Sequence, residues 1–249
     1  MKLVKVRNPE EMSAFAARRI IEKVSSSSML SLGLATGGTP VGTYEFLIDD
    51  YKKKQTTYRN VFTYNLDEYV GLESSHPNSY HYFMYNHLFN YIDIPSENVN
   101  IPNGVASNLK QEAISYEAKI DKIRGVDLQL LGIGENGHIG FNEPGTALNM
   151  LTHVLALSES TRQVNARYFN NYDEVPNHAI TMGISTILKS KEIILLASGE
   201  SKAEAVYRMF TEKVGSNCPA TVLRNHSNVV VVVDEKAVSK LEEIHANYL

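Results

Sequence analysis

One short segment of the chain combines residue types that can move protons. Residues 132–144 contain an amide, an imidazole and a carboxylate, at Asn136, His138 and Glu143, among closely spaced glycines. An imidazole accepts and releases protons near neutral pH, and a neighbouring carboxylate can hold it in place. His138 and Glu143 are five residues apart, so they meet only if the loop bends. The segment indicates a catalytic site for a small polar substrate.

Two adjacent carboxylates, Asp67 and Glu68, directly follow the apolar run 61–66. Neighbouring side chains in extended backbone point to opposite faces, so only one of the two is expected to face a ligand. Asp67 is the better candidate because it is the first residue past the predicted strand. Taken alone, the pair is also compatible with a helix N-cap or a solvated loop acid.

A glycine turn follows the apolar run 30–35 and precedes a predicted helix. Gly37, Gly38 and Thr39 lie in this turn. Backbone N–H groups in such a turn, together with the positive end of the next helix, favour phosphate binding. The turn is not a Walker loop, because no Lys-Ser/Thr pair follows a suitably spaced glycine. An ordinary tight turn is the alternative interpretation.

Other site types fit the sequence poorly. Residues 132–137 formally match the G-x-G-x-x-G pattern, but Pro144 interrupts the long helix that a dinucleotide site requires. The histidines lack metal-site spacing, and the single cysteine, Cys218, provides no thiolate cluster. No G-x-S-x-G motif marks a serine hydrolase. We therefore expect neither a bound metal nor a dinucleotide.

The composition is that of a globular protein without special partners. The chain has 249 residues, 43% hydrophobic and 21% charged, and a net charge of −4 without a block of like charge. Neither nucleic acid nor an anionic membrane is a favoured partner. No apolar run approaches the roughly 20 residues of a membrane helix. The single cysteine suits a reducing compartment, so we expect a cytoplasmic protein.

Short apolar strands alternate with helical patterns along the chain. This order predicts an α/β fold with a mostly parallel sheet covered by helices on both faces, and ligands bound beyond the carboxyl ends of the strands. We expect one domain over 1–249, with a possible mobile flap around 145–177. The predicted strands are 3–6, 30–35, 61–66, 128–133, 179–182, 193–197 and 229–233, and the predicted helices are 9–24, 45–51, 79–91, 109–123, 200–210 and 237–246.

Two segments carry a family resemblance. The run LDEYVGL at 66–72 and the run GHIGFNEP at 137–144 together resemble the glucosamine-6-phosphate deaminase family, and the turn GGTP at 37–40 matches in the same order. The resemblance covers nearly the whole chain. It implies conversion of glucosamine 6-phosphate and water to fructose 6-phosphate and ammonia, without a cofactor, on a Rossmann-like α/β fold.

The resemblance also implies roles for individual residues. Asp67 matches the base that takes a proton from C2 and returns one to C1. His138 matches the group that opens the pyranose ring, supported by Glu143. The implied phosphate site comprises Gly37, Gly38, Thr39, Arg167 and Lys202. From the sequence alone, Arg167 and Lys202 would be interpreted as solvated charges on helices. We further expect the backbone N–H groups of 134–137 to stabilise charge on O1 of the substrate.

The chain departs from the family pattern at two places. Some members have an aspartate where Asn136 stands; an amide can hold the imidazole but cannot stabilise its cation as a carboxylate does. We therefore expect His138 to rely more on Glu143. The basic residues that follow the Glu-Pro pair in allosteric members are missing from 145–155. We expect no activation by N-acetylglucosamine 6-phosphate and a monomer or small homo-oligomer, not an allosteric hexamer.

Two alternative functions stay open at this point. A 6-phosphogluconolactonase would share the fold and a Gly-His loop, but its loop continues with a run like Thr-Ala-Ser-Leu-Phe-Pro, and this chain reads IGFNEP at 139–144. A non-enzymatic sugar-phosphate sensor would be expected to carry a DNA-binding helix-turn-helix and a basic face. The acidic net charge and the retained acid–base residues disfavour the sensor.

Overall fold

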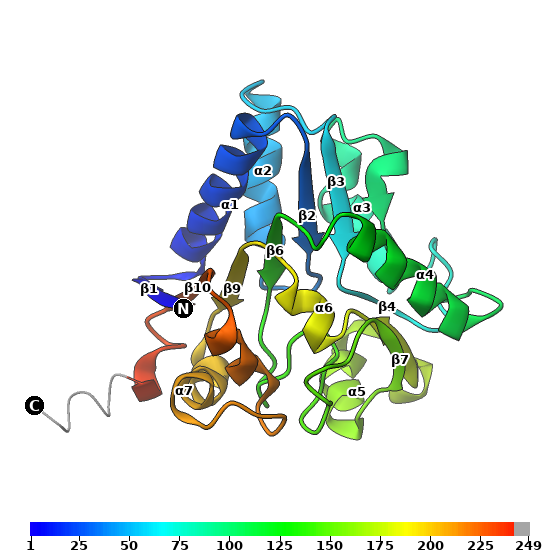
Figure 1. The fold of residues 1–249 in the computed structure, drawn as a ribbon, viewed down its shortest axis with the longest axis vertical. Coiled ribbons are helices and arrows are strands. Elements are labelled where there is room, and N and C mark those ends of the chain that lie inside the picture. Colours follow the sequence, from blue (N-terminus) through cyan, green and yellow to red (C-terminus); the bar gives the residue numbers. More distant parts are fainter. Residues whose placement is uncertain (242–249) are drawn as a thin grey trace, which may run out of the picture.

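The computed structural model describes residues 1–241 and is built around a seven-stranded parallel sheet (Figure 1). The strand order is β1-β10-β9-β6-β2-β3-β5. The bounds are β1 (Lys2–Val6), β2 (Leu30–Leu34), β3 (Val61–Asn65), β5 (Val99–Asn100), β6 (Leu128–Leu131), β9 (Ile193–Ala197) and β10 (Val229–Asp234). The central strands β2, β6 and β9 are buried at every position, as expected for a sheet covered on both sides.

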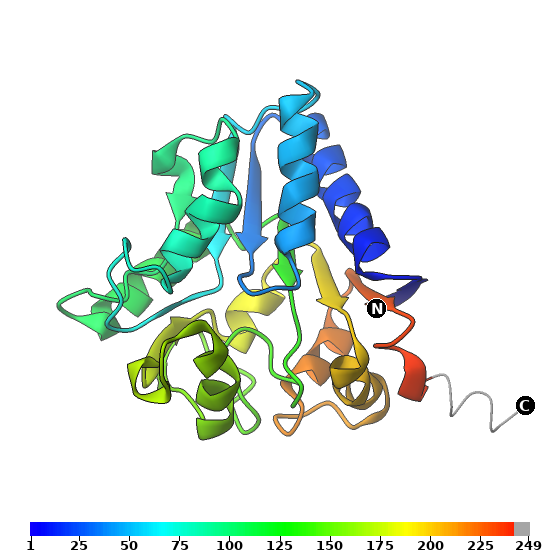
Figure 2. The same ribbon diagram turned by 180° about the vertical axis from the view of Figure 1, so that it is seen from behind.

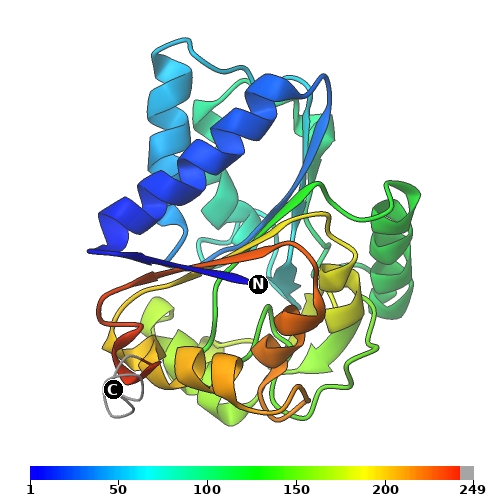
Figure 3. The same cartoon turned by 60° about the vertical axis from the view of Figure 1, so that its left-hand side comes forward.

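Helices cover both faces of this sheet, which Figure 3 shows from the side. One layer contains α1 (Pro9–Ser26), α2 (Val41–Lys52) and α3 (Tyr80–His87), and the other contains α4 (Leu109–Lys122), α6 (Ile184–Leu188) and α7 (Ala203–Thr211). Adjacent strand residues serve opposite layers: Leu130 packs in the first core and Leu131 in the second. Short 3-10 turns occur at Phe89–Tyr91, Ser96–Asn98, Ala166–Tyr168, Tyr172–Glu174, Glu200–Lys202 and Pro219–Asn225.

Helix α1 shows how the local sequence sets an element. The Asn8 side chain accepts a hydrogen bond from the backbone N–H of Glu11 at 2.9 Å, and Pro9 occupies the first helical position. Met12, Ala16 and Ile20 recur at a spacing of four residues and are buried against the sheet. The helix begins at Pro9, as predicted, and ends two residues later than predicted, at Ser26.

A second, three-stranded sheet lies beyond the carboxyl ends of the central strands (Figures 1 and 2). Its order is β4-β8-β7, antiparallel throughout, and α5 (Glu159–Asn165) follows β7. The strands are β4 (Asp67–Tyr69), β7 (His153–Ala156) and β8 (His178–Thr181). The buried carboxylate of Glu117 on α4 anchors the approach to β7, because it accepts hydrogen bonds from the N–H of Thr152, at 2.9 Å, and from its hydroxyl.

The fold class and most elements agree with the sequence-based prediction, and the differences are specific. The segment 145–177, for which no helix or strand was predicted, contains β7 and α5. The helix predicted over 79–91 ends at His87 and gives way to a 3-10 turn. Of the helix predicted over 237–246, residues 242–246 lie outside the described part of the chain.

None of the helices within residues 1–241 combines the length and apolarity that membrane crossing requires.

Candidate active site

Four neighbouring strands of the large sheet end at one cleft. In sheet order these are β9, β6, β2 and β3, and their carboxyl ends meet at the same edge because the strands are parallel. The cleft has a volume of about 1280 Å³. Its lining includes eight of the nine residues proposed from the sequence, namely Gly37, Gly38, Thr39, Asp67, Asn136, His138, Arg167 and Lys202. Glu143 lies behind His138.

Asp67 begins β4 and faces this cleft. Only 6% of the Asp67 surface is exposed to solvent. Within residues 1–241 its carboxylate has no hydrogen-bond partner. Burial, followed by the nearby charge of Glu68, raises the pKa of Asp67 to about 8. A carboxyl group in this setting binds a proton more tightly than a solvated one, which is the property required of a base that abstracts a weakly acidic proton.

Glu68 points to the other face of β4, as the alternation of extended backbone predicts. One carboxylate oxygen accepts the backbone N–H groups of Tyr69 and Tyr80, at 2.8 and 2.9 Å, and the other accepts that of His81 at 2.8 Å. Burial raises its pKa to about 7, and these three N–H groups oppose the rise. Glu68 therefore binds the N-terminus of α3 and does not line the cleft.

Hydrogen bonds to β8 connect the loop that carries His138 to the strand that carries Asp67. Asp67 and Thr181 are paired residues of the β4–β8 ladder. The Thr181 hydroxyl accepts the N–H of Phe141 at 3.1 Å, and the buried Asn142 amide donates to the carbonyl of Met182 at 2.9 Å. A Cβ placed on Gly140 would lie 3.7 Å from Oδ2 of Asp67. The two proposed catalytic segments are thus held together by β8, which the sequence analysis did not connect with them.

His138, Asn136 and Glu143 form a chain of hydrogen bonds. Nδ1 of His138 lies 2.8 Å from Oδ1 of Asn136, and Nδ2 of Asn136 donates to Oε2 of Glu143 at 2.7 Å. The direct distance from Nδ1 of His138 to Oε2 of Glu143 is 3.6 Å. The loop bends as predicted. The nearest partner of the imidazole is the Asn136 amide, and the Glu143 carboxylate lies close to the same ring nitrogen and is itself bonded to this amide. That His138 relies more on Glu143 stays a prediction.

The loop also corrects the expected set of backbone donors. The N–H of Gly134 bonds to the carbonyl of His138 at 2.9 Å, and that of Gly137 bonds to the carbonyl of Gly134 at 3.0 Å. These two donors are used within the loop, so for Gly134 and Gly137 the prediction that they stabilise charge on a substrate is wrong. For the N–H groups of Glu135 and Asn136 it stays a prediction. Gly134 has a packing role instead, because a Cβ at this position would overlap the His138 ring.

The turn after β2 opens the backbone to the cleft. A Cβ at Gly37 or Gly38 would meet no atom within 4 Å, so the peptide groups of this turn are uncovered on the cleft side. Helix α2 begins directly afterwards, and its N-terminus has no side-chain cap. The positive end of α2 and the peptide N–H groups together offer an anion site.

Two cations face the same cleft from other segments. Lys202 follows β9, and Arg167 lies in the 3-10 turn after α5. Burial, with a further contribution from the positive charge of Arg167, lowers the pKa of Lys202, while the charge of Glu135 opposes this. The turn before Lys202 is fixed by the carboxylate of Asp234, which accepts the Ser198 hydroxyl at 2.7 Å. An anion bound between the two cations would offset their repulsion.

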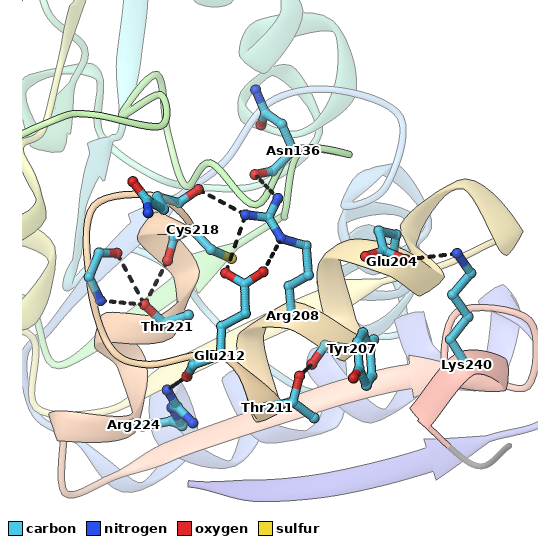
Figure 4. A network of polar contacts seen from close by, with 12 residues as sticks. Asn136, Glu204, Tyr207, Arg208, Thr211, Glu212, Cys218, Thr221, Arg224 and Lys240 are labelled. Carbon is cyan, nitrogen blue, oxygen red and sulfur yellow. Dashed lines mark hydrogen bonds and ion pairs between the residues drawn. The ribbon is translucent and has the colours of Figure 1, made fainter. Parts of the chain in front are cut away.

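Arg208 on α7 supports the loop that carries Asn136 and His138 from behind (Figure 4). It donates to the backbone carbonyl of Asn136 at 3.3 Å and to the carboxylate of Glu212 at 2.7 Å. The N–H of Ala220 bonds to the carbonyl of Gly137 at 2.9 Å, so the segment after α7 contacts the same loop. Sequence reasoning assigned Arg208 no role, because a helical arginine followed four residues later by a glutamate resembles a surface ion pair.

Aromatic side chains form one wall of the cleft near Asp67. The rings of Tyr80 and Phe141 are stacked, with centroids 6.0 Å apart and planes at 8°, and Tyr69 lies 4.8 Å from Tyr80. All three line the cleft, and so does Phe169. This apolar wall contributes to the burial that raises the pKa of Asp67.

Over the described part of the chain, no group of three or more His, Cys, Asp or Glu is arranged to hold a metal ion.

Comparison with known proteins finds close relatives over nearly the whole chain. The family model for glucosamine-6-phosphate isomerases and 6-phosphogluconolactonases matches residues 7–232. A glucosamine-6-phosphate deaminase of Geobacillus sp. (strain WCH70) is 53% identical over 239 residues, 96% of this chain and 95% of that protein. Another from Halalkalibacterium halodurans is 50% identical over 241 residues, 97% of this chain and 98% of that protein.

Solved structures give the same grouping. The structure of a monomeric glucosamine-6-phosphate deaminase is 48% identical, with a TM-score of 0.95, over 96% of this chain and 100% of that one. A 6-phosphogluconolactonase from Trypanosoma brucei is 22% identical, with a TM-score of 0.79, over 96% and 98% of the two chains. The lactonase therefore shares the fold alone.

Proposed function

Because the chain belongs to the family of glucosamine-6-phosphate isomerases and 6-phosphogluconolactonases and has glucosamine-6-phosphate deaminase activity, we propose that Asp67 and His138 are the acid–base groups of this reaction. The reaction converts glucosamine 6-phosphate and water to fructose 6-phosphate and ammonia. The observation that carries the assignment is the position of both side chains at one cleft, Asp67 just after β3 and His138 in the loop that follows β6.

The phosphate is held away from the reacting carbons. Gly37, Gly38 and Thr39 supply peptide N–H groups at the start of α2, and Arg167 and Lys202 supply the opposite charge. Binding energy from this remote group orients the sugar, so that C1 and C2 lie near the catalytic groups. Charge-assisted hydrogen bonds to an anion are the strong ones, which suits an anchoring role.

His138 opens the ring. Its Nδ1 contacts Asn136, which leaves Nε2 for the substrate. Nε2 takes the proton from the anomeric hydroxyl, the C1–O5 bond breaks as the C1–O1 carbonyl forms, and the proton passes to O5. One imidazole can perform both transfers because it accepts and releases a proton in the neutral range. Such acid–base assistance is commonly worth about 10²–10⁴-fold in rate.

Asp67 then moves the proton between carbons. The carboxylate takes the C2 proton, which leaves an enolamine with a C1–C2 double bond and the negative charge on O1. Asp67 returns the proton to C1 and a proton passes from the nitrogen to O1, which gives an imine at C2 and a hydroxyl at C1. Water adds to this imine and ammonia leaves, so the products are fructose 6-phosphate and ammonia and the atoms balance. The raised pKa of Asp67, about 8, supports this role because a stronger base removes a carbon-bound proton more readily.

The proposal also covers the oligomeric state of the protein and the cellular compartment in which it acts. We propose a monomer, because the solved deaminase that covers 96% of this chain is described as monomeric. Size-exclusion chromatography with light scattering would test this, and a hexamer would contradict it. We also propose a cytoplasmic location, which the single buried cysteine, Cys218, supports because free thiols persist in reducing compartments.

Two variants separate the proposed roles. Asp67→Asn should lower fructose 6-phosphate formation by about 10²–10⁴-fold and stop exchange of the C2 proton with solvent deuterium, while substrate binding stays within a few fold. His138→Gln should lower turnover of the ring form but leave binding of an open-chain substrate analogue unchanged. Substantial turnover by Asp67→Asn would show that another group is the base. Equal loss of ring-form and open-chain binding in His138→Gln would contradict the ring-opening role.

A further inference from the structure

The carboxylate of Glu143 has partners that neither the sequence motif nor the reaction accounts for. Its Oε1 accepts hydrogen bonds from the hydroxyls of Thr161 and Ser158, the latter at 3.3 Å. Its Oε2 accepts the amide of Asn136 at 2.7 Å. The two hydroxyls come from α5 and its N-cap, which belong to the segment beside the second sheet. The ring-opening loop is therefore joined to α5 through a single carboxylate.

Glu143 is ionised throughout the neutral range. Burial alone would raise its pKa, but His138, Thr161 and Asn136 together lower it to about 2. An ionised carboxylate can only accept hydrogen bonds. Each of its partners must therefore be a donor. The hydroxyls of Thr161 and Ser158 bind Oε1, so Oε2 faces Asn136.

This polarity fixes the orientation of the Asn136 amide. An amide presents a donor on one side and an acceptor on the other, and the nitrogen has to face the acceptor-only carboxylate. Oδ1 then faces Nδ1 of His138 at 2.8 Å, and it also accepts the backbone N–H of His138 at 3.2 Å, which supports the same orientation. Since Oδ1 is an acceptor, Nδ1 must carry the hydrogen. In the neutral imidazole Nε2 then has a free lone pair, and this is the nitrogen that the substrate meets.

We propose that Thr161 and Ser158 are positioning residues that, through Glu143 and Asn136, hold His138 in the tautomer with its hydrogen on Nδ1. The inference rests on the ring-opening role proposed for His138. It adds a contribution from Thr161 on α5, which is connected to the imidazole by three hydrogen bonds in series, through Glu143 and Asn136. Thr161 is the better probe of the two, because Ser158 also caps α5 by accepting the N–H of Thr161 at 3.1 Å.

The kinetic test compares Thr161→Val with Thr161→Ser. Valine keeps the branched shape at this 6% exposed position but removes the donor, and serine restores it. We expect Thr161→Val to lower kcat/KM for glucosamine 6-phosphate about 10-fold or more, and Thr161→Ser to stay within about 3-fold of wild type. Gln163→Ala on the exposed face of α5 is the matched control and should change nothing. Binding of the reduced, open-chain amino-alditol phosphate should be unchanged in all three variants.

The direct test is the tautomer itself. In protein labelled with ¹⁵N-histidine, the signals of His138 are assigned by their absence from His138→Gln. With the imidazole neutral, we expect the wild type to show a protonated Nδ1 and a bare Nε2, and Thr161→Val to show a mixture of both tautomers. Thr161→Ser should restore the wild-type pattern.

The outcomes are separable. A wild-type His138 protonated on Nε2, or a Thr161→Val variant with unchanged tautomer and unchanged kcat/KM, would overturn the proposal. If Thr161→Val weakened binding of the open-chain analogue as much as it lowered kcat/KM, Thr161 would have a general structural role instead. Full activity of His138→Gln would remove the ring-opening role itself, independently of any result at Thr161.

Discussion

Asp67 and Glu68 are adjacent in the chain, but their carboxylates lie on opposite faces of β4. One faces the cleft without a hydrogen-bond partner in the described part of the chain, and the other accepts three backbone N–H groups at the start of α3. They still interact, because the charge of Glu68 contributes to the raised pKa of Asp67. The residue that does not line the cleft therefore affects the basicity of the one that does.

This coupling predicts the effect of Glu68→Gln. Removing the charge should lower the pKa of Asp67, so the acidic limb of the kcat/KM profile should move to lower pH. The substituted amide would also place a donor against the N–H of His81, with an expected loss of about 1–3 kcal/mol in unfolding free energy. Glu73→Gln, an exposed change on the same segment, removes one charge without either effect and is the control. Superimposable pH profiles for the two variants would contradict the coupling.

Asp67 should also make stability depend on pH. Its folded-state pKa, about 8, lies above the ordinary value of 3.8, so between these values the folded protein holds a proton that the unfolded chain has lost. The unfolding free energy should therefore fall as pH rises through this window, by at most about 1.4 kcal/mol per pH unit. Asp67→Asn should flatten this slope and be more stable than wild type at pH 8. Denaturant unfolding from pH 5 to 8 measures the difference, and equal slopes would contradict it.

Lys202→Met tests the proposed phosphate site. The loss of this half-buried cation should raise KM for glucosamine 6-phosphate about 10- to 100-fold, with a smaller change in kcat. Glucosamine without the phosphate should be handled equally by wild type and variant, because the lost contact is to the phosphate. Lys213→Met removes an exposed lysine and serves as the charge control. A variant equally impaired on both substrates would show that Lys202 acts elsewhere.

Regulation provides a further prediction. The segment 145–155 contains no lysine or arginine to hold a second sugar phosphate. Addition of N-acetylglucosamine 6-phosphate should therefore leave the deaminase rate at low substrate concentration unchanged or lower it by competition. Initial rates measured with and without this compound decide the point, and an increase in rate would refute it.

The sequence predicted the large sheet well because its strands are continuous apolar runs. Ile193–Ala197 and Val229–Asp234 contain almost no other residue types, and such runs between helices are typical of buried parallel strands. The second sheet was mostly missed for the opposite reason. Its strand β4 has three residues, Asp-Glu-Tyr, and β7 has four, so neither shows a periodicity that stands out from a loop.

The parts of the candidate site that lie within the sequence motifs could be predicted, and the contacts from other segments could not. The strand-end position of Asp67 and the bent loop of His138 follow from local sequence. The contribution of Thr161 does not, because a threonine three residues after an N-cap serine is a common helix start. Likewise, nothing near Thr181 indicates that it bonds to a loop 40 residues away. These contacts arise from the packing of α5 and β8 against the loop, which single-sequence patterns do not encode.

The order of the four strand ends has a consequence for how such a site can diversify. Along the edge, residues proposed to bind the phosphate after β9 and β2 alternate with the proposed catalytic residues after β6 and β3, and Arg167 reaches the cleft from the turn after α5. In this assignment, phosphate binding and catalysis belong to separate loops. Replacement of the catalytic loops would leave the phosphate-binding loops in place, so a scaffold of this kind can acquire a new reaction and still bind phosphorylated carbohydrates.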